Sequence, residues 1–367
     1  MASRALRAEQ QANTAQRGRA DHLEFTQRCP VTYLAIIKCR GRLLMVEKVI
    51  RLSVIVPFFN VERYAAENLA SLAQNANPDM EFILVDDGST DATSSIIAEG
   101  AAWLSGAQLI RLSRNSGLSA ARNAGLAQAR GRYLSFLDGD DVAAPAHFSA
   151  LVQVIERLRC DFVRTDHVQV RGRQRLLHRT SHAPRGVVRP ARSGIGPAGQ
   201  RSSVDAPYAW AGIYHRRLLE AGLLRFDENL RTCEDRPWIW GLHLHAHNFA
   251  VVGLHGVRYR RDISASLTQL SDERQFDFIP AFERIIRQVS ADPDASILLL
   301  TALQSYCAVI CHHLSQRERY PLSLQHKLQN AIVASLRRLP VEPLQITIAA
   351  LDVERAVTVE KLLLEAA

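Results

Sequence analysis

Two aspartate-rich segments, residues 86–91 and residues 138–141, are the strongest candidates for chemistry in this sequence, and each directly follows a short apolar run. In the second segment, Asp138 and Asp140 form an Asp-x-Asp pair, whose carboxylate oxygens suit a hard cation such as Mg²⁺ or Mn²⁺. Such a cation would bridge the carboxylates to a diphosphate and stabilise that diphosphate as it leaves. The opposing explanation, that these residues only form turns or cap helices, stays open for each segment taken alone.

Two further segments carry charged side chains at predicted helix starts. Gly117 opens one helix and Arg122 lies about one turn inside it, which suits a bound anion, although an ordinary capped surface helix has the same pattern. Glu234 and Asp235 begin another helix, where a carboxylate can act as general base toward an acceptor hydroxyl or simply complement the helix dipole. The second helix also carries two tryptophans that either stack on a sugar or, as is more common, pack in the core: Trp238 and Trp240.

The elements that would position these residues follow a strand–helix alternation that begins at residue 52. The predicted strands are 52–56, 81–85, 108–112 and 133–137, and the predicted helices are 61–75, 90–104, 118–130 and 145–158. Short apolar strands alternating with helices of this length predict a parallel sheet covered on both faces. Ligands of such sheets bind beyond the carboxyl ends of the strands, so both aspartate segments are expected at one edge. That shared position favours a binding site over two unrelated turns.

The second half of the chain is less regular. A stretch rich in Arg, Gly, Ser and Pro, residues 171–203, predicts a long mobile basic loop. A segment at 208–214 and helices near 216–221 and 234–247 come next. They are followed by a short strand pair near 249–252 and 257–259, and by helical patterning from about residue 272 to the end.

The expected domain organisation has three parts. Residues 1–50 are interpreted as a disordered or mis-annotated extension, with residues 1–28 disordered and the natural start at Met45. A single α/β domain spans 51–265, with a nucleotide-binding half at 51–165 and an acceptor-side half at 166–265. A helical C-terminal region covers 266–367.

Composition narrows the partners and the compartment. The 367 residues carry a net charge of +8 and a pI of about 9.4, which favours anionic partners. The basic residues are dispersed, with no Lys/Arg block interleaved with aromatics, so nucleic acid is not expected as a partner. Six scattered cysteines suit a reducing compartment, and we expect a cytoplasmic protein. The uncharged stretch 295–316 is interrupted by polar residues and is interpreted as a buried helix rather than a membrane span.

Taken together, four segments resemble glycosyltransferase family 2, a large group of inverting transferases with a GT-A type fold. The resemblance extends over about residues 51–262 and rests on residues 52–60, 83–91, 117–125 and 133–141, whose order and spacing are similar to those of the family. It implies a mostly parallel sheet sandwiched by helices, a nucleotide-sugar donor and a divalent metal, Mn²⁺ or Mg²⁺.

The resemblance also implies roles for individual positions. Asp235 would be the catalytic base with Glu234 beside it, Asp140 a metal ligand, and Asp138 a ligand of the metal or the donor. Residues 259–264 resemble the segment that lies near the donor phosphates, and the third protein ligand of the metal is left open. Asp87 would contact the base of the nucleotide, commonly uracil. The other donor-binding positions would be Pro57, Asn60, Glu62, Gly117 and Arg122.

The expected function is the inverting transfer of a sugar from a nucleoside-diphosphate sugar, with UDP-sugar as the expected donor, to a hydroxyl of a glycan, polysaccharide or lipid-linked acceptor. Peripheral contact with the inner face of the cytoplasmic membrane is also expected. One alternative is a relative that binds nucleotide sugars without catalysis. Another is a sugar nucleotidyltransferase, for which a Gly-rich phosphate loop is expected after the first strand; residues 57–60, Pro-Phe-Phe-Asn, are not one.

Overall fold

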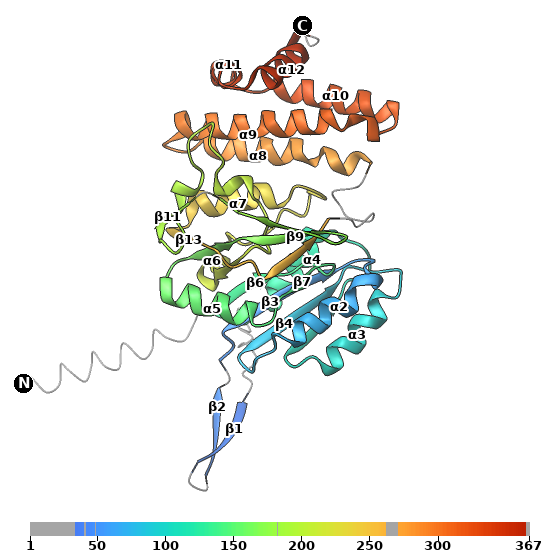
Figure 1. Cartoon of the computed structure of the whole chain (residues 1–367), viewed down its shortest axis with the longest axis vertical. Helices are drawn as coiled ribbons and strands as arrows, with labels where there is room; N and C mark the ends of the chain where they lie inside the picture. Colours follow the sequence, from blue (N-terminus) through green and yellow to red (C-terminus); the bar gives the residue numbers. More distant parts are fainter. Residues whose placement is uncertain (1–33, 40–41, 48, 182, 262–270, 365–367) are drawn as a thin grey trace, which may run out of the picture. The chain divides into compact units, whose positions relative to one another are not determined.

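The computed structural model describes residues 34–39, 42–47, 49–181, 183–261 and 271–364. The chain divides into two units, Met1–Lys48 and Val49–Ala367. In the first, β1 (Leu34–Cys39) and β2 (Arg42–Glu47) form an antiparallel hairpin in which Leu34 pairs with Glu47 (Figure 1). We did not predict this hairpin, because residues 1–50 were interpreted as an extension. The predicted disorder of residues 1–28 lies outside the described residues.

The second unit is built on an eight-stranded sheet with the order β11-β13-β8-β12-β6-β3-β4-β5. The strands β3, β4, β5 and β6 are mutually parallel, β8 is parallel to β13, and β12 runs antiparallel to both of its neighbours. Its strands are β3 (Leu52–Phe58), β4 (Met80–Asp86), β5 (Ala107–Arg111), β6 (Tyr133–Phe136), β8 (Phe162–Thr165), β11 (Arg189–Pro190), β12 (Gly212–His215) and β13 (Asn248–Val252).

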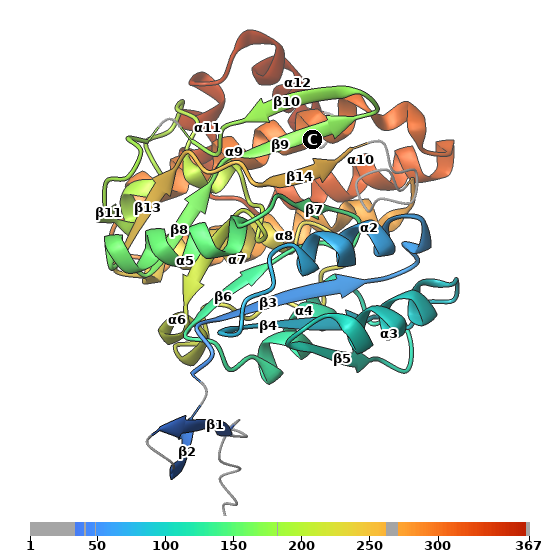
Figure 2. The same cartoon turned by 60° about the horizontal axis from the view of Figure 1, so that its bottom comes forward.

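A second sheet of four strands has the order β10-β9-β14-β7 (Figure 2). Its strands are β7 (Val142–Ala143), β9 (His167–Arg171), β10 (Gln174–His178) and β14 (Val257–Arg260). We predicted β13 and β14 as a strand pair. Both strands are present, but they do not pair, because β13 joins the large sheet beside β8 and β14 joins the small sheet beside β9.

Helices cover the large sheet as the alternation predicted. Every residue of β3 and β4 is buried, as expected for strands covered on both faces. Gly125 lets α4 lie close to β3, because a Cβ added there would sit 2.4 Å from Cγ2 of Ile55. The helices of this part are α2 (Glu62–Ala73), α3 (Thr93–Trp103), α4 (Leu118–Gln128), α5 (His147–Leu158), α6 (Arg216–Glu220) and α7 (Asp235–His245).

The predicted mobile loop at residues 171–203 contains regular structure. It includes β10, β11 and the 3₁₀ helix η1 (Ala191–Gly194), and a second 3₁₀ helix, η2 (Ser203–Asp205), begins at its end. The prediction of a loop without regular structure is therefore wrong. The Gly- and Arg-rich composition does not predict strands here. In the structure β10 pairs with β9, and β11 pairs with β13.

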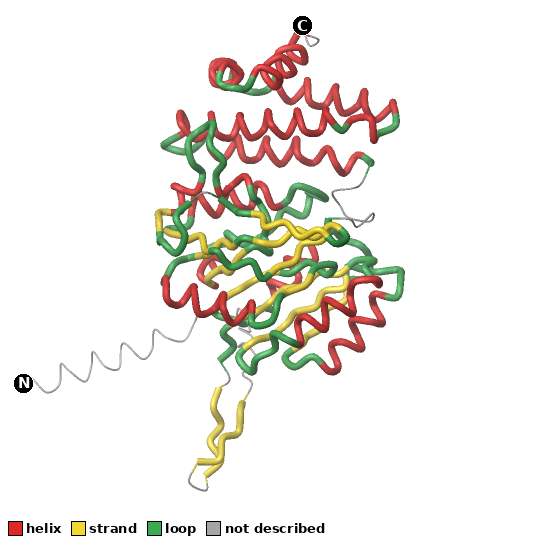
Figure 3. Tube along the Cα trace, viewed as in Figure 1, coloured by secondary structure: helices red, strands yellow, loops and turns green. Residues whose placement is uncertain are grey.

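Helices follow the sheets toward the C-terminus, as predicted from residue 272 onward (Figure 3). After the 3₁₀ helix η4 (Glu273–Asp277) they are α8 (Phe278–Ser290), α9 (Ala295–Ser315), η5 (Arg317–Arg319), α10 (Leu322–Leu336), α11 (Val341–Ala349) and α12 (Val353–Leu364). By length and composition α9 could cross a membrane. In the structure α9 packs against α8, α11 and α12 and buries Leu303, Tyr306, Cys307 and Ile310, as predicted for a core helix.

Candidate functional site

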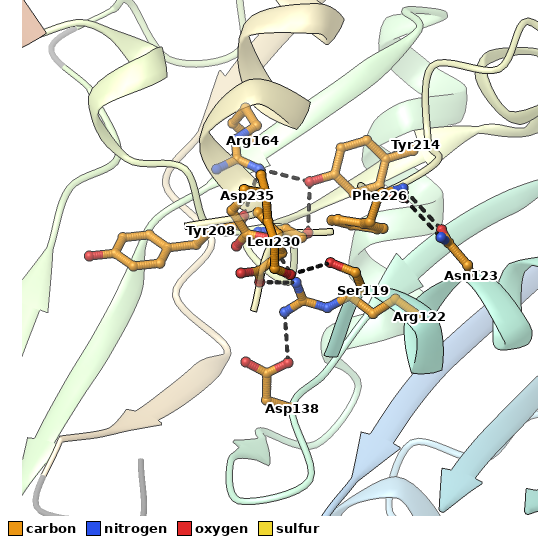
Figure 4. Close-up of polar contacts among 12 residues, drawn as sticks. Ser119, Arg122, Asn123, Asp138, Arg164, Tyr208, Tyr214, Phe226, Leu230 and Asp235 are labelled. Carbon is orange, nitrogen blue, oxygen red and sulfur yellow. Dashed lines mark hydrogen bonds and ion pairs between the residues drawn. The ribbon is translucent and has the colours of Figure 1, made fainter. Parts of the chain in front are cut away.

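The guanidinium of Arg122, on α4, lies at the centre of a cluster of carboxylates (Figure 4). Its Nη1 donates to Oε1 of Glu234 at 2.9 Å and to Oδ1 of Asp235 at 2.7 Å, and its Nη2 donates to Oδ1 of Asp138 at 3.0 Å. The Arg122 side chain is 1% exposed. Burial opposes its charge, but the three carboxylates outweigh burial, and the pKa of Arg122 is raised. This cluster joins residues that lie 16, 112 and 113 positions apart from Arg122.

The acidic pair lies at the start of α7. Asp235 is the first residue of the helix, and its Oδ2 accepts a hydrogen bond from the backbone N–H of Ala209 at 3.1 Å. Burial raises the pKa of Asp235, and the charge of Arg122 opposes that rise. Burial and then the charge of Asp235 raise the pKa of Glu234 to about 8. Cys233, immediately before the pair, adopts φ 59°, which is an uncommon conformation for a residue with a side chain.

The Asp138–Asp141 loop is held through its backbone. Nδ2 of Asn68, on α2, donates to the carbonyl oxygens of Asp138 (3.0 Å) and Asp141 (2.9 Å). From β14, Nη1 of Arg260 donates to the carbonyl oxygen of Asp140 (2.9 Å). Gly139 permits the close approach of the loop to β3, because an added Cβ would meet Cδ1 of Phe58 at 2.5 Å and the carbonyl oxygen of Pro57 at 2.8 Å.

Asn68 is a site residue that our sequence reasoning missed. A polar side chain on the apolar face of the predicted helix 61–75 was the available signal, since a buried amide needs polar partners. Arg260 belonged to the segment that the family resemblance placed near the donor phosphates, and the structure places it against the Asp140 loop. Residues 262–264 of that segment lie outside the described residues.

The charged forms of Asp140 and Asp141 are disfavoured by burial and by the neighbouring carboxylates. Burial and then the charge of Asp138 raise the pKa of Asp140 to about 7. Burial and then the charge of Asp140 raise the pKa of Asp141 well above its usual range. Oδ1 of Asp141 accepts from the backbone N–H of Arg260 at 2.8 Å, whereas its buried Oδ2 has no partner among the described residues. A cation beside these carboxylates would offset their repulsion. Within the described ranges, no group of three or more His, Cys, Asp or Glu residues is arranged to hold a metal ion.

Asp87 holds the two residues that precede α4. Its Oδ1 accepts from the N–H of Ser116 (2.7 Å) and its Oδ2 from the N–H of Gly117 (2.8 Å), directly before α4. The anion at this helix start is therefore Asp87 itself. Gly117 and Arg122, which we predict to bind the donor, have partners within the protein: the N–H of Gly117 binds Asp87, and Arg122 pairs with three carboxylates. Their contact with a donor stays a prediction. A carboxylate can accept about four hydrogen bonds, so Asp87 can still accept hydrogen bonds from a nucleotide base.

The loops after β3 and β4 are joined by the other predicted donor-binding residues. Oδ1 of Asn60 accepts from the N–H of Thr90 at 2.8 Å, and Oε2 of Glu62 accepts from the N–H of Ala92 at 3.0 Å. Asn60 adopts φ 50°, which fits an Asn at a tight turn. The structure thus brings Pro57, Asn60, Glu62 and Asp87 to the carboxyl ends of β3 and β4. Their contact with a nucleotide stays a prediction.

The aromatic residues that lie near Asp235 are not the two tryptophans that we considered for stacking on a sugar. Trp238 and Trp240 are buried in the core, so the hypothesis that they stack on a sugar is wrong. Instead, Tyr208 and Trp210 flank Ala209, whose N–H binds Asp235. The Tyr208 and Trp210 rings stack with centroids 5.0 Å apart, and the Tyr259 ring lies 5.0 Å from Trp210. Half-buried Tyr208 and Tyr259 therefore provide an aromatic surface beside the candidate base.

The family model described as glycosyl transferase family 2 matches residues 53–220. Among curated proteins, the chain is 32% identical over 220 residues to the glycosyltransferase EpsJ of Bacillus subtilis, covering 59% of this chain and 63% of EpsJ. It is 36% identical over 122 residues to the dodecaprenyl-phosphate galacturonate synthase of Rhizobium johnstonii, covering 31% of this chain and 35% of that protein. The chain therefore spans less than two thirds of the length of these relatives.

The fold is similar to that of S. aureus TarS. A crystal structure of TarS residues 1–349 in complex with UDP-GlcNAc superimposes with a TM-score of 0.66 and 22% sequence identity, covering 85% of this chain and 90% of that one. At this level of identity the similarity establishes the fold alone. It confirms the predicted fold, a mostly parallel sheet flanked by helices with a helical C-terminal region.

Proposed function

We propose that this chain, which belongs to glycosyltransferase family 2 through its domain at residues 53–220, transfers a sugar from a UDP-sugar to an acceptor hydroxyl with inversion. Its curated relatives are named as glycosyltransferases, and the TarS fragment of the same fold was crystallised with UDP-GlcNAc. The acceptor would be a glycan, a polysaccharide or a lipid-linked glycan. We place the reaction in the cytoplasm, with acceptors presented at the inner face of the membrane.

Asp140 and Asp138 would hold the divalent cation, Mn²⁺ or Mg²⁺, and this assignment rests on the chemistry of the loop. Carboxylate oxygens are preferred ligands of both ions. Two carboxylates, with donor phosphate oxygens and water, are a common set for Mg²⁺, so a third protein ligand is not required. Burial and the charge of Asp138 raise the pKa of Asp140, and a bound cation would favour its charged form. When bound, the cation would supply charge stabilisation to the departing diphosphate.

Asp235 would take the proton of the acceptor hydroxyl. Its pKa is raised above the usual value, which strengthens it as a base relative to an ordinary aspartate. The hydrogen bond from Ala209 and the ion pair with Arg122 fix the carboxylate orientation, and Tyr208 borders it on the acceptor side. Glu234 would hold Arg122 in place rather than contact the acceptor, because its side chain is only 8% exposed.

The observation that carries this proposal is the bridge that Arg122 makes between Asp138 and Asp235. One buried guanidinium holds the donor-side carboxylate and the candidate base at 3.0 Å and 2.7 Å from its nitrogens. Both reacting partners must be held against each other for a direct displacement, and this bridge sets that geometry.

The experiment is UDP release from a panel of UDP- and GDP-sugars with Mn²⁺, Mg²⁺ or EDTA, combined with thermal shift to report donor binding. We expect metal-dependent donor binding to be lost in Asp140→Asn. In Asp235→Asn we expect donor binding to be kept and turnover to be lost. Asp352→Asn, an exposed aspartate before α12, is the matched control and should behave as wild type.

Each outcome separates the alternatives. Normal turnover by Asp235→Asn would remove Asp235 as the base. Donor binding without UDP release under any condition would support the non-catalytic relative. Equal donor binding with Mn²⁺ and with EDTA would refute the metal assignment at Asp140.

A further inference from the structure

The segment from residue 167 to residue 204 contains eight arginines and no Asp or Glu. Two of the eight are neutralised by carboxylates from outside the segment: Arg185 by Asp166, and Arg192 by Asp292 and Asp294. Four others lie on or beside the β9–β10 hairpin, are exposed, and have no carboxylate at ion-pair distance in the part of the chain that the structure describes: Arg171, Arg173, Arg175 and Arg179. We call residues 167–179 the cationic hairpin.

The cationic hairpin adjoins the candidate base through a continuous series of contacts. Oδ2 of Asp235 accepts from the N–H of Ala209, whose neighbour Trp210 lies 5.0 Å from the Tyr259 ring. Tyr259 belongs to β14 and is paired in register with Gln169 of β9. The hairpin is therefore part of the same small sheet as β14, the strand that carries Tyr259 (Figure 2).

A second series of contacts runs along the base of the hairpin. The rings of His167 and His178, opposite each other on β9 and β10, stack with centroids 4.6 Å apart. His167 lies 5.1 Å from Tyr208, and Nε2 of His178 lies 3.1 Å from Nη2 of Arg201. The exposed guanidinium of Arg201 thus lies beside the base of the hairpin.

We propose that the cationic hairpin binds the acceptor and that the acceptor carries phosphate or carboxylate groups at a distance from the hydroxyl that reacts. This inference rests on the proposed function. Guanidinium groups pair with both anions in a bidentate manner, and a run of unpaired guanidiniums repels itself until an anion binds. Tyr208 and Tyr259 receive the sugar beside Asp235, while the arginines bind the charged units that follow it.

An anionic bilayer is the rival occupant, because Leu176 and Leu177 on β10 are 64% and 50% exposed. A bilayer surface, however, needs no continuity with the reacting centre. The direct connection of the hairpin to Tyr259, through adjacent strands, favours a chain-like substrate that extends from Asp235 over the hairpin.

The test measures binding of defined anions by the full chain, with UDP and Mn²⁺ present at saturation so that the donor site is occupied. The probes are oligogalacturonate and glycerol-phosphate oligomers, with maltodextrin of equal length as the neutral comparison. Phosphatidylcholine vesicles with and without phosphatidylglycerol form a separate arm. We expect one or both anionic oligomers to bind in a salt-sensitive manner and maltodextrin to bind weakly or not at all. Which oligomer binds distinguishes a carboxylate-bearing from a phosphate-bearing acceptor.

The variant is Arg173→Glu with Arg179→Glu, and its matched control is Arg157→Glu with Arg337→Glu. The control makes the same change in net charge at two exposed arginines, on α5 and directly after α10, that have no ion pair among the described residues. We expect the hairpin variant to weaken oligomer binding by about tenfold or more and the control to leave it within about twofold. If the hairpin variant does not fold, the variant Arg173→Gln with Arg179→Gln replaces it.

Binding of oligomers by the hairpin variant as tightly as by wild type would overturn the inference. So would equal binding of maltodextrin, or binding to anionic vesicles alone. Thermal shift with UDP-sugar separates this failure from that of the proposed function. A chain that responds to UDP-sugar but binds no anionic oligomer refutes only the acceptor inference, whereas one without any response to UDP-sugar refutes the proposed function.

Discussion

Replacing Arg122 with Met should leave three carboxylates without their shared cation and destabilise the protein severely. Removing one partner of a buried ion pair costs about 3–5 kcal/mol, because the remaining charge stays desolvated. Glu234 and Asp235 are 8% and 16% exposed and Asp138 is 22% exposed, so solvent relieves the charge only in part. At about 2–4 °C per kcal/mol for a domain of 150–250 residues, the melting temperature should fall by roughly 10 °C.

The destabilisation should depend on pH with a definite sign. The pKa of Glu234 is raised from 4.5 to about 8, so the folded state binds protons more tightly than the unfolded state does. Its contribution to stability is therefore present below the unfolded pKa and is lost as pH rises through the folded value. Since the charge of Arg122 lowers the pKa of both Glu234 and Asp235, its removal raises both further. The stability of Arg122→Met should fall more steeply than that of wild type between about pH 5 and pH 8.

The assay is urea unfolding followed by far-ultraviolet circular dichroism at both ends of that pH range. Arg157→Met, which removes an exposed arginine from α5, is the control and should shift the midpoint little. Adding Glu234→Gln to Arg122→Met should recover part of the loss, since one stranded charge is removed. Equal midpoints for Arg122→Met and wild type, or a loss that is the same at both pH values, would refute the electrostatic account of this cluster.

Three further variants test other parts of the site. Gly139→Ala should cost about 1–3 kcal/mol and weaken metal-dependent donor binding, because its Cβ would overlap Phe58 and a backbone carbonyl; unchanged unfolding and thermal shift would contradict this. Asn68→Ala removes two hydrogen bonds to the Asp138–Asp141 loop and should weaken Mn²⁺-dependent donor binding. The pH profile of turnover should stay unchanged. Trp238→Ala should cost about 3–5 kcal/mol in urea unfolding while the folded fraction keeps its acceptor KM, and a selective rise in that KM would restore the sugar-stacking hypothesis.

Local patterns were sufficient to predict the first half of the fold. The four strands β3, β4, β5 and β6 and the helices between them were predicted to within a few residues, because continuous apolar runs and helical periodicity are properties of short segments. Their alternation implied a parallel sheet, and a parallel sheet brings the segments after β4 and β6 to one edge. The position of both aspartate segments was therefore determined by the sequence, as was the place of Asp235 at a helix start.

The roles of these residues were decided by contacts between distant segments. Whether Arg122 faces a phosphate or a carboxylate depends on α7, whose acids lie 112 and 113 residues away. Asp87 binds the backbone of Ser116 and Gly117 because the tertiary fold brings the start of α4 to the end of β4. A helix start with an arginine has the same sequence pattern whether the arginine faces a phosphate or a carboxylate, so only the packed structure could distinguish these two arrangements.

The structure on the acceptor side was the part that the sequence predicted least well. The strand β9 pairs with β14, which lies about ninety residues further along the chain, and β10 pairs in turn with β9, so this sheet depends on contacts between distant segments. Burial of Trp238 likewise follows from which face of α7 meets the core. The sequence by itself determined where the nucleotide-side carboxylates lie, since strand ends are local features. The tertiary structure alone decided how Arg122 couples them to Asp235 and which surface continues toward the acceptor, since both are products of long-range packing.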